Sequence, residues 1–232
     1  MFSKDYKKIK KSSNYGRIQM EDVRVSFEGE NKAILDNFSI SIEPGEFISI
    51  LGTSGVGKTT LLRAISGFKR IDKGYIRING LLTSSSFVHV QPEKRRLGFV
   101  FQDYALFPHI NVFENIGFGI SKRDKSRTDK INKIIDLISL KSHESKFPVQ
   151  LSGGQQQRVA IGRALAINPS AILMDEPFSN LDYKLKESLS REVKKIINQS
   201  KTTAILVTHD EVEAKRLSDK CFILENGKLK SV

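Results

Sequence analysis

A glycine-rich loop with one lysine is the clearest chemical feature of the sequence. Residues 52–59, GTSGVGKT, match the pattern G-x-x-x-x-G-K-[ST] between an apolar stretch and a helical one. Glycines let backbone N–H groups turn toward phosphate oxygens, the lysine reaches the outer phosphates, and the threonine hydroxyl can ligate Mg²⁺. Kinases, GTPases, helicases and transport ATPases share this loop, so it indicates a nucleoside triphosphate but not how its energy is used. The candidate nucleotide-binding residues are Gly52, Thr53, Ser54, Gly55, Val56, Gly57, Lys58, Thr59 and Thr60.

Two adjacent carboxylates, Asp175 and Glu176, follow an apolar run at residues 171–174. If that run is a strand of a parallel sheet, its carboxyl end is where ligands bind. There Asp175 could hold Mg²⁺ through water, and Glu176 could polarise an attacking water as a general base. Standing alone, such a pair is more often a solvated strand end. Downstream of a phosphate loop, it predicts hydrolysis of a γ-phosphate.

Gln102 and His209 each follow another strand-like run, at residues 98–101 and 206–208. Taken separately, each is a kind of polar residue that often ends a strand. If both strands are neighbours of the strand before Asp175, Gln102 can point at Mg²⁺ and water. His209 can then donate a hydrogen bond to a phosphate oxygen. We therefore treat Gln102 and His209, together with Glu176, as candidate catalytic residues.

A second anion-binding helix start lies at residues 151–160, LSGGQQQRVA. Ser152 is a good N-cap, and Gly153 and Gly154 expose backbone N–H groups ahead of a helix. One chain with one nucleotide loop has no obvious use for two such sites. The simplest explanation is that this second site serves a nucleotide held by another subunit.

The elements that must position these residues are short strands and helices. Alternating apolar residues predict early strands, continuous apolar runs predict later strands covered on both faces, and apolar residues at helical spacing predict helices. This order predicts an α/β domain with an added β layer and a helical insert. The predicted strands are residues 23–27, 38–42, 47–51, 75–78, 97–101, 171–174 and 204–207, and the predicted helices are residues 60–65, about 128–140 and 183–199.

Composition restricts the class of protein. The chain has 232 residues, 28% of them charged, and a formal net charge of +12, which suits a soluble globular protein. It has no apolar stretch long enough for a membrane helix and no secretory signal, and its one cysteine favours a reducing compartment. Residues 1–19 are polar and basic and predict a flexible extension before a folded domain at 20–232. The positive charge is compatible with nucleic acid, an anionic membrane face or a nucleotide.

Together the motifs resemble the ATP-binding subunit of ABC transporters over about residues 20–230. LSGGQQQR is similar to that family's signature, and it occurs with a Walker A loop, the Walker B strand ILMDE, the Q-loop Gln102 and the switch His209 in the family's order. The resemblance implies a P-loop NTPase cassette with a parallel-sheet core, an antiparallel β subdomain and an α-helical signature subdomain at about residues 103–165.

The resemblance also implies a head-to-tail homodimer with each ATP between the Walker loop of one copy and the signature of the other. Phe27 would stack on adenine, and Thr59, Gln102 and Asp175 would hold Mg²⁺. Residues 179–182 resemble the D-loop, with Asn180 where alanine is usual. The residues that would contact the ATP of the other subunit are Ser152, Gly153, Gly154, Gln155 and Asp182.

Residues 100–109, VFQDYALFPH, resemble the importers of polyamines, ferric iron, sulfate, thiamine and sugars. The implied partners are two transmembrane permease subunits and, indirectly, an extracytoplasmic solute-binding protein, with the chain on the cytoplasmic face of the inner membrane. Tyr104, Leu106 and Phe107, if exposed, would form an apolar docking patch for the permease. Because the chain ends at Val232, it resembles the short form without a C-terminal regulatory domain. Ferric iron and polyamine are the leading candidates for the cargo.

Two alternatives remain from other classes. One is an ABC exporter ATPase, which the motifs alone do not separate from an importer. The other is a soluble ABC-type ATPase acting on nucleic acid or ribosomes, which the positive charge favours. Such proteins usually carry tandem cassettes, coiled-coil inserts or zinc-binding cysteines, and this sequence has none of these. We therefore expect no nucleic-acid partner.

Overall fold

The computed structural model describes residues 13–26, 32–179, 181 and 183–231. Phe27 and Asp182, predicted to contact nucleotide, lie outside the described residues, as do residues 1–12 of the predicted extension. Within the described ranges, no helix is both long enough and apolar enough to cross a membrane.

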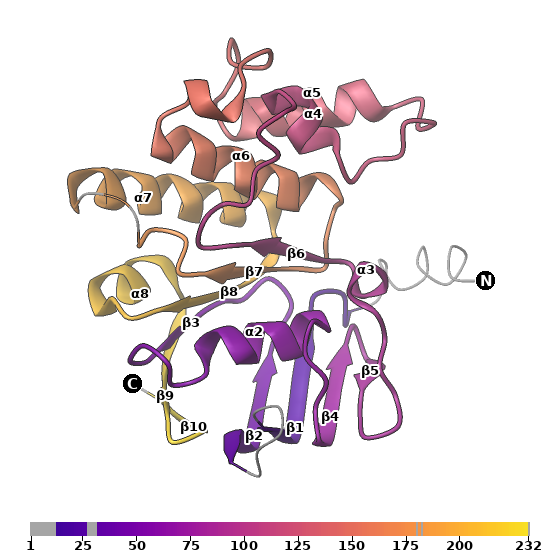
Figure 1. Cartoon of the computed structure of the whole chain (residues 1–232), viewed down its shortest axis with the longest axis vertical. Coiled ribbons are helices and arrows are strands. Elements are labelled where there is room, and N and C mark those ends of the chain that lie inside the picture. The colour runs from indigo at the N-terminus through magenta and orange to yellow at the C-terminus, as the bar shows by residue number, and fades with distance from the viewer. Residues whose placement is uncertain (1–12, 27–31, 180, 182, 232) are drawn as a thin grey trace.

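A six-stranded sheet forms the centre of the molecule, in the order β10-β9-β3-β8-β7-β6 (Figure 1). Neighbouring strands from β9 to β6 are parallel, and β10 pairs antiparallel with β9. Every residue of β3, β7 and β8 is buried, which confirms the prediction of strands covered on both faces. The strands are β3 (Phe47–Leu51), β6 (Leu97–Val100), β7 (Ala171–Asp175), β8 (Thr203–Thr208), β9 (Lys220–Glu225) and β10 (Lys228–Ser231).

A four-stranded antiparallel sheet, in the order β2-β1-β4-β5, forms a second layer, and α2 (Lys58–Ser66) lies between the two sheets (Figure 1). Leu61, Leu62 and Ile65 of α2 are fully buried in the core between these layers. The two-residue turn at Asn79 and Gly80 joins β4 to β5. The strands are β1 (Ile18–Ser26), β2 (Ala33–Ile42), β4 (Lys73–Ile78) and β5 (Leu81–Ser84).

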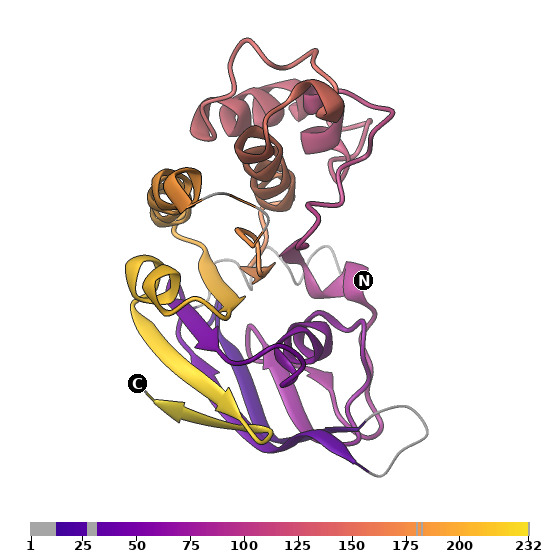
Figure 2. The same cartoon turned by 60° about the vertical axis from the view of Figure 1, so that its left-hand side comes forward.

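Helices cover the other face of the parallel sheet and form a second core. Alternate residues of β8 face the two cores: Ile205 and Val207 pack toward α2, whereas Ala204 and Leu206 pack toward the helices. The helices α4, α5 and α6 form a separate group above the sheet (Figures 1 and 2), at the position of the predicted helical subdomain. The helices are α3 (Pro92–Arg95), α4 (Val112–Gly117), α5 (Arg127–Leu137), α6 (Gly153–Ala166), α7 (Tyr183–Ser200) and α8 (Glu211–Leu217), with a 3₁₀ turn at Pro148–Gln150.

The first strand begins at Ile18, earlier than the predicted domain boundary at residue 20. Ile18 is fully buried and pairs with Ile42 on one side and Ile78 on the other. It is therefore an integral part of the antiparallel sheet. Just before it, the Tyr15 hydroxyl donates a hydrogen bond to the carbonyl of Asn168 at 3.0 Å. The polar, basic composition of this segment concealed the apolar alternation that already starts at Ile18.

The prediction that Tyr104 belongs to an exposed apolar docking patch is wrong. Tyr104 is only 7% exposed and packs in the core of the helical group, while Leu106 and Phe107 are half-buried. The aromatic side chains exposed nearby are those of Phe101 and Phe118. The error arose because a run of apolar residues after a strand does not reveal which side chains turn inward.

Candidate nucleotide site

The glycine-rich loop joins the end of β3 to the start of α2, as its pattern predicts. Gly57 immediately precedes α2 with φ 113°, and an added Cβ there would lie 2.7 Å from Ile34 Cγ2, so a larger residue does not fit. The first turn of α2 carries no acidic residue, and no side chain caps it. Its N–H groups and the positive end of the helix dipole are therefore available to an anion.

Lys58 is held over the loop by three oxygen atoms. Its Nζ donates to the carbonyls of Gly52 at 2.7 Å and Thr53 at 3.1 Å, and it lies 3.2 Å from Glu176 Oε1. The side chain is 4% exposed. A buried ammonium needs anionic or carbonyl partners, and phosphate oxygens would serve the same three donors.

Thr59 and Asp175 form an oxygen pair beside the loop. The Thr59 hydroxyl donates to Asp175 Oδ1 at 3.0 Å, linking the start of α2 to the end of β7. Asp175 is 8% exposed, and burial raises the pKa of its carboxyl group, an effect to which neighbouring Glu176 adds. A hydroxyl and a carboxylate are the hard ligands that Mg²⁺ prefers. These two residues therefore fit a magnesium ion between β7 and α2.

Glu176 lies between Lys58 and His209. One carboxylate oxygen pairs with Lys58, and the other, Oε2, is 3.0 Å from His209 Nδ1. Glu176 has φ 43°, a left-handed conformation that costs roughly 1–2 kcal/mol for a residue with a side chain. Such strain persists where surrounding contacts hold it, and it is common at functional sites. Here the ends of neighbouring strands β7 and β8 fix Glu176 and His209 together.

Gln102 follows the edge strand β6, which pairs in parallel with β7. Because parallel strands end at the same edge of a sheet, Gln102 and Asp175 follow neighbouring strand ends. Gln102 is exposed, and the chain then turns sharply, with left-handed φ values at Tyr104 and Ala105. The structure thus brings Lys58, Thr59, Asp175, Glu176 and His209 into one cluster, with Gln102 after the adjacent strand.

The signature residues form a different kind of helix start. The Ser152 hydroxyl accepts from Gln155 N at 3.4 Å, and Gln155 Oε1 accepts from Ser152 N at 3.0 Å, which closes a capping box at α6. An added Cβ at Gly154 would meet Leu185 and Leu189 at 3.4–3.5 Å, an ordinary contact distance. α6 belongs to the helical group, whereas α2 lies on the other face of the parallel sheet (Figure 2). The two helix starts that the sequence predicts to bind phosphate therefore lie in different parts of the chain's fold.

A polar network behind His209 was missed in the sequence. Lys186 Nζ on α7 lies 2.8 Å from Asp210 Oδ2 and 3.3 Å from Glu213 Oε2. Asp210 also caps α8 by accepting from Glu213 N, and Thr208 donates to Glu213. Burial raises the pKa of Glu213, while Lys186 opposes that rise. The spacing of Asp210 and Glu213 is that of a capping box, a signal that could have located this helix start.

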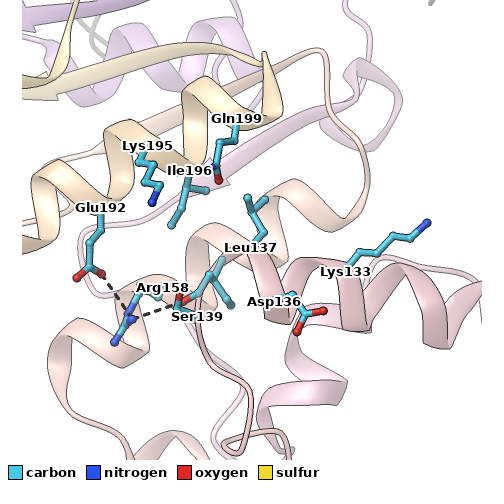
Figure 3. Close-up of a pocket in the computed structure, with 10 residues that line it drawn as sticks. Lys133, Asp136, Leu137, Ser139, Arg158, Glu192, Lys195, Ile196 and Gln199 are labelled. Atoms are coloured by element: carbon cyan, nitrogen blue, oxygen red, sulfur yellow. Dashed lines mark hydrogen bonds and ion pairs between the residues drawn. The ribbon is translucent and has the colours of Figure 1, made fainter.

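A pocket of about 530 Å³ lies between α5, α6 and α7 (Figure 3). Its lining carries both charges, among them Lys133, Asp136, Arg158 and Glu192. Arg158 Nη1 lies 3.5 Å from both the Ile138 carbonyl and Glu192 Oε2, so neither contact is short. None of the predicted site residues lines this pocket.

The fold and the first cluster define a P-loop nucleotide-binding protein: a parallel sheet, a glycine-rich loop before a helix, and an acidic pair on a neighbouring strand. The family model described as ABC transporter matches residues 35–179, more than half of the chain. The chain belongs to this family.

Curated relatives and solved structures agree with this assignment. The chain is 42% identical over 218 residues to the spermidine/putrescine import ATP-binding protein PotA of Nitratidesulfovibrio vulgaris, covering 93% of this chain and 58% of that protein. It is 42% identical over 215 residues to the Fe(3+) ions import ATP-binding protein FbpC of Fusobacterium nucleatum, covering 91% of this chain and 56% of that protein. The chain thus spans little more than half the length of these relatives.

The solved structures are similar over nearly their whole length. A dimeric structure of the bacterial ABC transporter cassette MJ0796 matches with a TM-score of 0.76 and 32% identity, covering 92% of this chain and 96% of that one. A dimeric post-hydrolysis state of the same cassette, bound to ADP and Pi, matches with a TM-score of 0.75 and 31% identity over the same shares. The predicted fold class is confirmed.

Proposed function

We propose that this chain is the ATP-binding and ATP-hydrolysing subunit of an ABC importer. The observation that carries the proposal is the contact of Glu176 with both the P-loop Lys58 and His209. This contact joins the phosphate-binding loop to a candidate base and to a hydrogen-bond donor at the ends of adjacent strands.

Each residue of the cluster has a role in the proposed reaction. Lys58 and the N–H groups at the start of α2 bind the β- and γ-phosphates, and Thr59 and Asp175 hold Mg²⁺, with Gln102 approaching from β6. A magnesium ion held there would supply positive charge against the charge that develops on the phosphate oxygens. Glu176 turns from Lys58 toward a water molecule and accepts its proton, while His209 donates a hydrogen bond to the γ-phosphate.

We further propose that the nucleotide lies between two copies of the chain. Ser152, Gly153, Gly154 and Gln155 of one copy would bind the triphosphate held by the P-loop of the other. Support comes from the position of α6 apart from α2 and from the dimeric structures of MJ0796. Phe27 on adenine and Asp182 at the neighbouring site belong to the same proposal.

The names of the import ATP-binding relatives support the partners and location that we propose. Two transmembrane permease subunits would receive the motion of the dimer at the cytoplasmic face of the inner membrane, and a solute-binding protein would deliver the cargo outside. PotA is named for spermidine and putrescine and FbpC for Fe(3+), so a polyamine or ferric iron is the proposed cargo. We propose no nucleic-acid partner.

Nucleotide titration tests the binding step. Lys58→Ala removes the ammonium that would contact the phosphates, and we expect at least a tenfold weaker affinity for a fluorescent ATP analogue, about 1.4 kcal/mol. Lys130→Ala, an exposed lysine of α5, is the matched control and should bind normally. Unchanged affinity in Lys58→Ala would contradict the assignment of the loop. Uptake of labelled spermidine or Fe³⁺ into vesicles that hold the permease tests the direction of transport.

A further inference from the structure

The segment after Gln102 has an unusual backbone. Tyr104 and Ala105 have φ values of 63° and 45°, two consecutive left-handed residues that are not glycine. Residues in this conformation persist when neighbouring groups hold them there. The contacts that hold this segment therefore help to determine the position of Gln102.

Arg163, on the last turns of α6, makes the two contacts that span this turn. Its Nη1 donates to the Ala105 carbonyl at 2.6 Å and its Nη2 to the Tyr104 carbonyl at 2.8 Å. The rigid guanidinium fork can bridge two adjacent carbonyls, which a lysine ammonium cannot match in geometry. Burial lowers the pKa of Arg163, and the charge of nearby Asp103 opposes this change.

Two further contacts fix the same segment. The Arg163 guanidinium also lies over the Phe107 ring, 5.4 Å from its centroid. Asn115 of α4 is fully buried, and its side chain accepts from Phe107 N at 3.0 Å and donates to the Phe107 carbonyl at 3.1 Å. Residues 104–107 are thus attached to α6 and to α4, and only Phe101, Gln102 and Asp103 separate them from β6, which ends at Val100.

We infer that Arg163 is a positioning residue for Gln102. Helix α6 begins with the signature after Ser152, and near its other end Arg163 donates to the two carbonyls of the turn that follows Gln102. A displacement of α6, caused by whatever Ser152 and its neighbours bind, is then transmitted to Gln102 through this clamp. The role of Gln102 at the metal rests on the proposed function, whereas the clamp itself does not.

Hydrogen exchange of the nucleotide-free chain tests the clamp without any activity. Arg163→Met should speed amide exchange in peptides covering residues 102–107 by about tenfold or more, because local opening no longer breaks the two side-chain bonds. Arg163→Lys, which keeps the charge but not the fork, should give an intermediate rate. Arg158→Met is the matched control, since it removes a half-buried guanidinium of the same helix that does not reach this segment. Unchanged exchange in both Arg163 variants would overturn the inference.

A double-mutant cycle tests the link to Gln102. Arg163→Met should raise the Mg²⁺ concentration needed for half-maximal ATPase several-fold, and Gln102→Ala should do the same. Together they should raise it no further, because both act through one residue. Effects that multiply would overturn the positioning role. If exchange at 102–107 responds as expected but Gln102→Ala leaves the ATPase unchanged, the clamp is supported and the metal role of Gln102 fails.

Discussion

The P-loop and the signature are both glycine-containing helix starts without acidic residues, yet they use glycine for different reasons. Gly57 of the P-loop has φ 113° and would clash with Ile34 if it carried a Cβ. Gly154 of the signature has no such backbone, and its own chain leaves room for a Cβ. The first glycine is required by the fold of this chain. The second is buried, and an added Cβ there would make only ordinary contacts with Leu185 and Leu189, so the fold of this chain does not require glycine at that position.

The side chains around the two helix starts also differ in how far along the chain their contacts reach. The P-loop cluster joins segments far apart in sequence, since Thr59 contacts Asp175 and Lys58 contacts Glu176. The signature side chains form local contacts, Ser152 with Gln155 and Gln155 with His143. The proposed function therefore assigns phosphate and metal binding to the first region and contact with the triphosphate of a second copy to the other.

The largest effect is expected from a substitution of Glu176 in the P-loop cluster. Glu176→Gln removes the candidate base but keeps its shape, and we expect ATP turnover to fall by about 10³-fold, within the usual range for a lost general base. Binding of ATP should remain, and the ATP-bound dimer should accumulate. Phosphate release under saturating ATP and a nucleotide titration measure the two effects.

A glutamate outside the cluster provides the control for that variant. Glu187→Gln on α7 removes an exposed ion pair with Arg191 and should leave turnover unchanged. If Glu176→Gln hydrolyses ATP at the normal rate, the base lies elsewhere and the division between the two regions is wrong.

A pair of alanine substitutions separates the two uses of glycine. Gly57→Ala should destabilise the fold by about 2 kcal/mol, because a left-handed conformation and a contact of 2.7 Å both oppose the new Cβ. Gly154→Ala should leave the free energy of unfolding unchanged or raise it by about 0.5 kcal/mol, because alanine favours a helix. Because the added Cβ would face Leu185 and Leu189 of the same chain at ordinary contact distance, its ATPase should stay close to that of the wild type.

Urea unfolding without nucleotide and steady-state ATPase measure this pair. Equal losses of stability in both variants would show that the signature glycine serves its own chain. A large loss of ATPase in a stable Gly154→Ala variant would show that a second molecule approaches this glycine closely.

A smaller effect concerns Asp175 in the absence of nucleotide. Burial raises its pKa in the folded chain above its ordinary value, so the folded state binds the proton more tightly than the unfolded state. The stabilisation is complete below the ordinary pKa and is lost as pH rises through the folded pKa. Asp175→Asn removes the buried charge and should raise Tm by roughly 2–4 °C at pH 7.

That gain should shrink as the pH falls, because the buried wild-type carboxyl group, whose pKa is raised, then takes up its proton. Mg²⁺ with ATP should stabilise the wild-type chain more than the variant, because only the wild type offers a carboxylate ligand. Thermal melts at several pH values, with and without nucleotide, measure both trends. A lower Tm for the variant without nucleotide would contradict the stated cost of the buried charge.

The sequence predicts those parts that depend on local patterns. Continuous apolar runs predict β7 and β8, and the spacing of Gly52, Gly57 and Lys58 predicts the loop between β3 and α2. Contacts between distant residues have no such pattern. Arg163 meets Tyr104 across 59 positions, and the burial of Tyr104 itself depends on that packing rather than on its neighbours in the chain.

Sedimentation of the Glu176→Gln variant, with and without Ser152→Arg, tests most directly whether one triphosphate site needs two copies. With ATP, Glu176→Gln alone should sediment as a dimer of the 26.1 kDa chain. The added arginine projects from the exposed start of α6, so we expect a monomer that still binds ATP with unchanged affinity. A dimer that forms equally well with Arg at position 152 would contradict the shared site, and so would a monomer that has lost ATP binding.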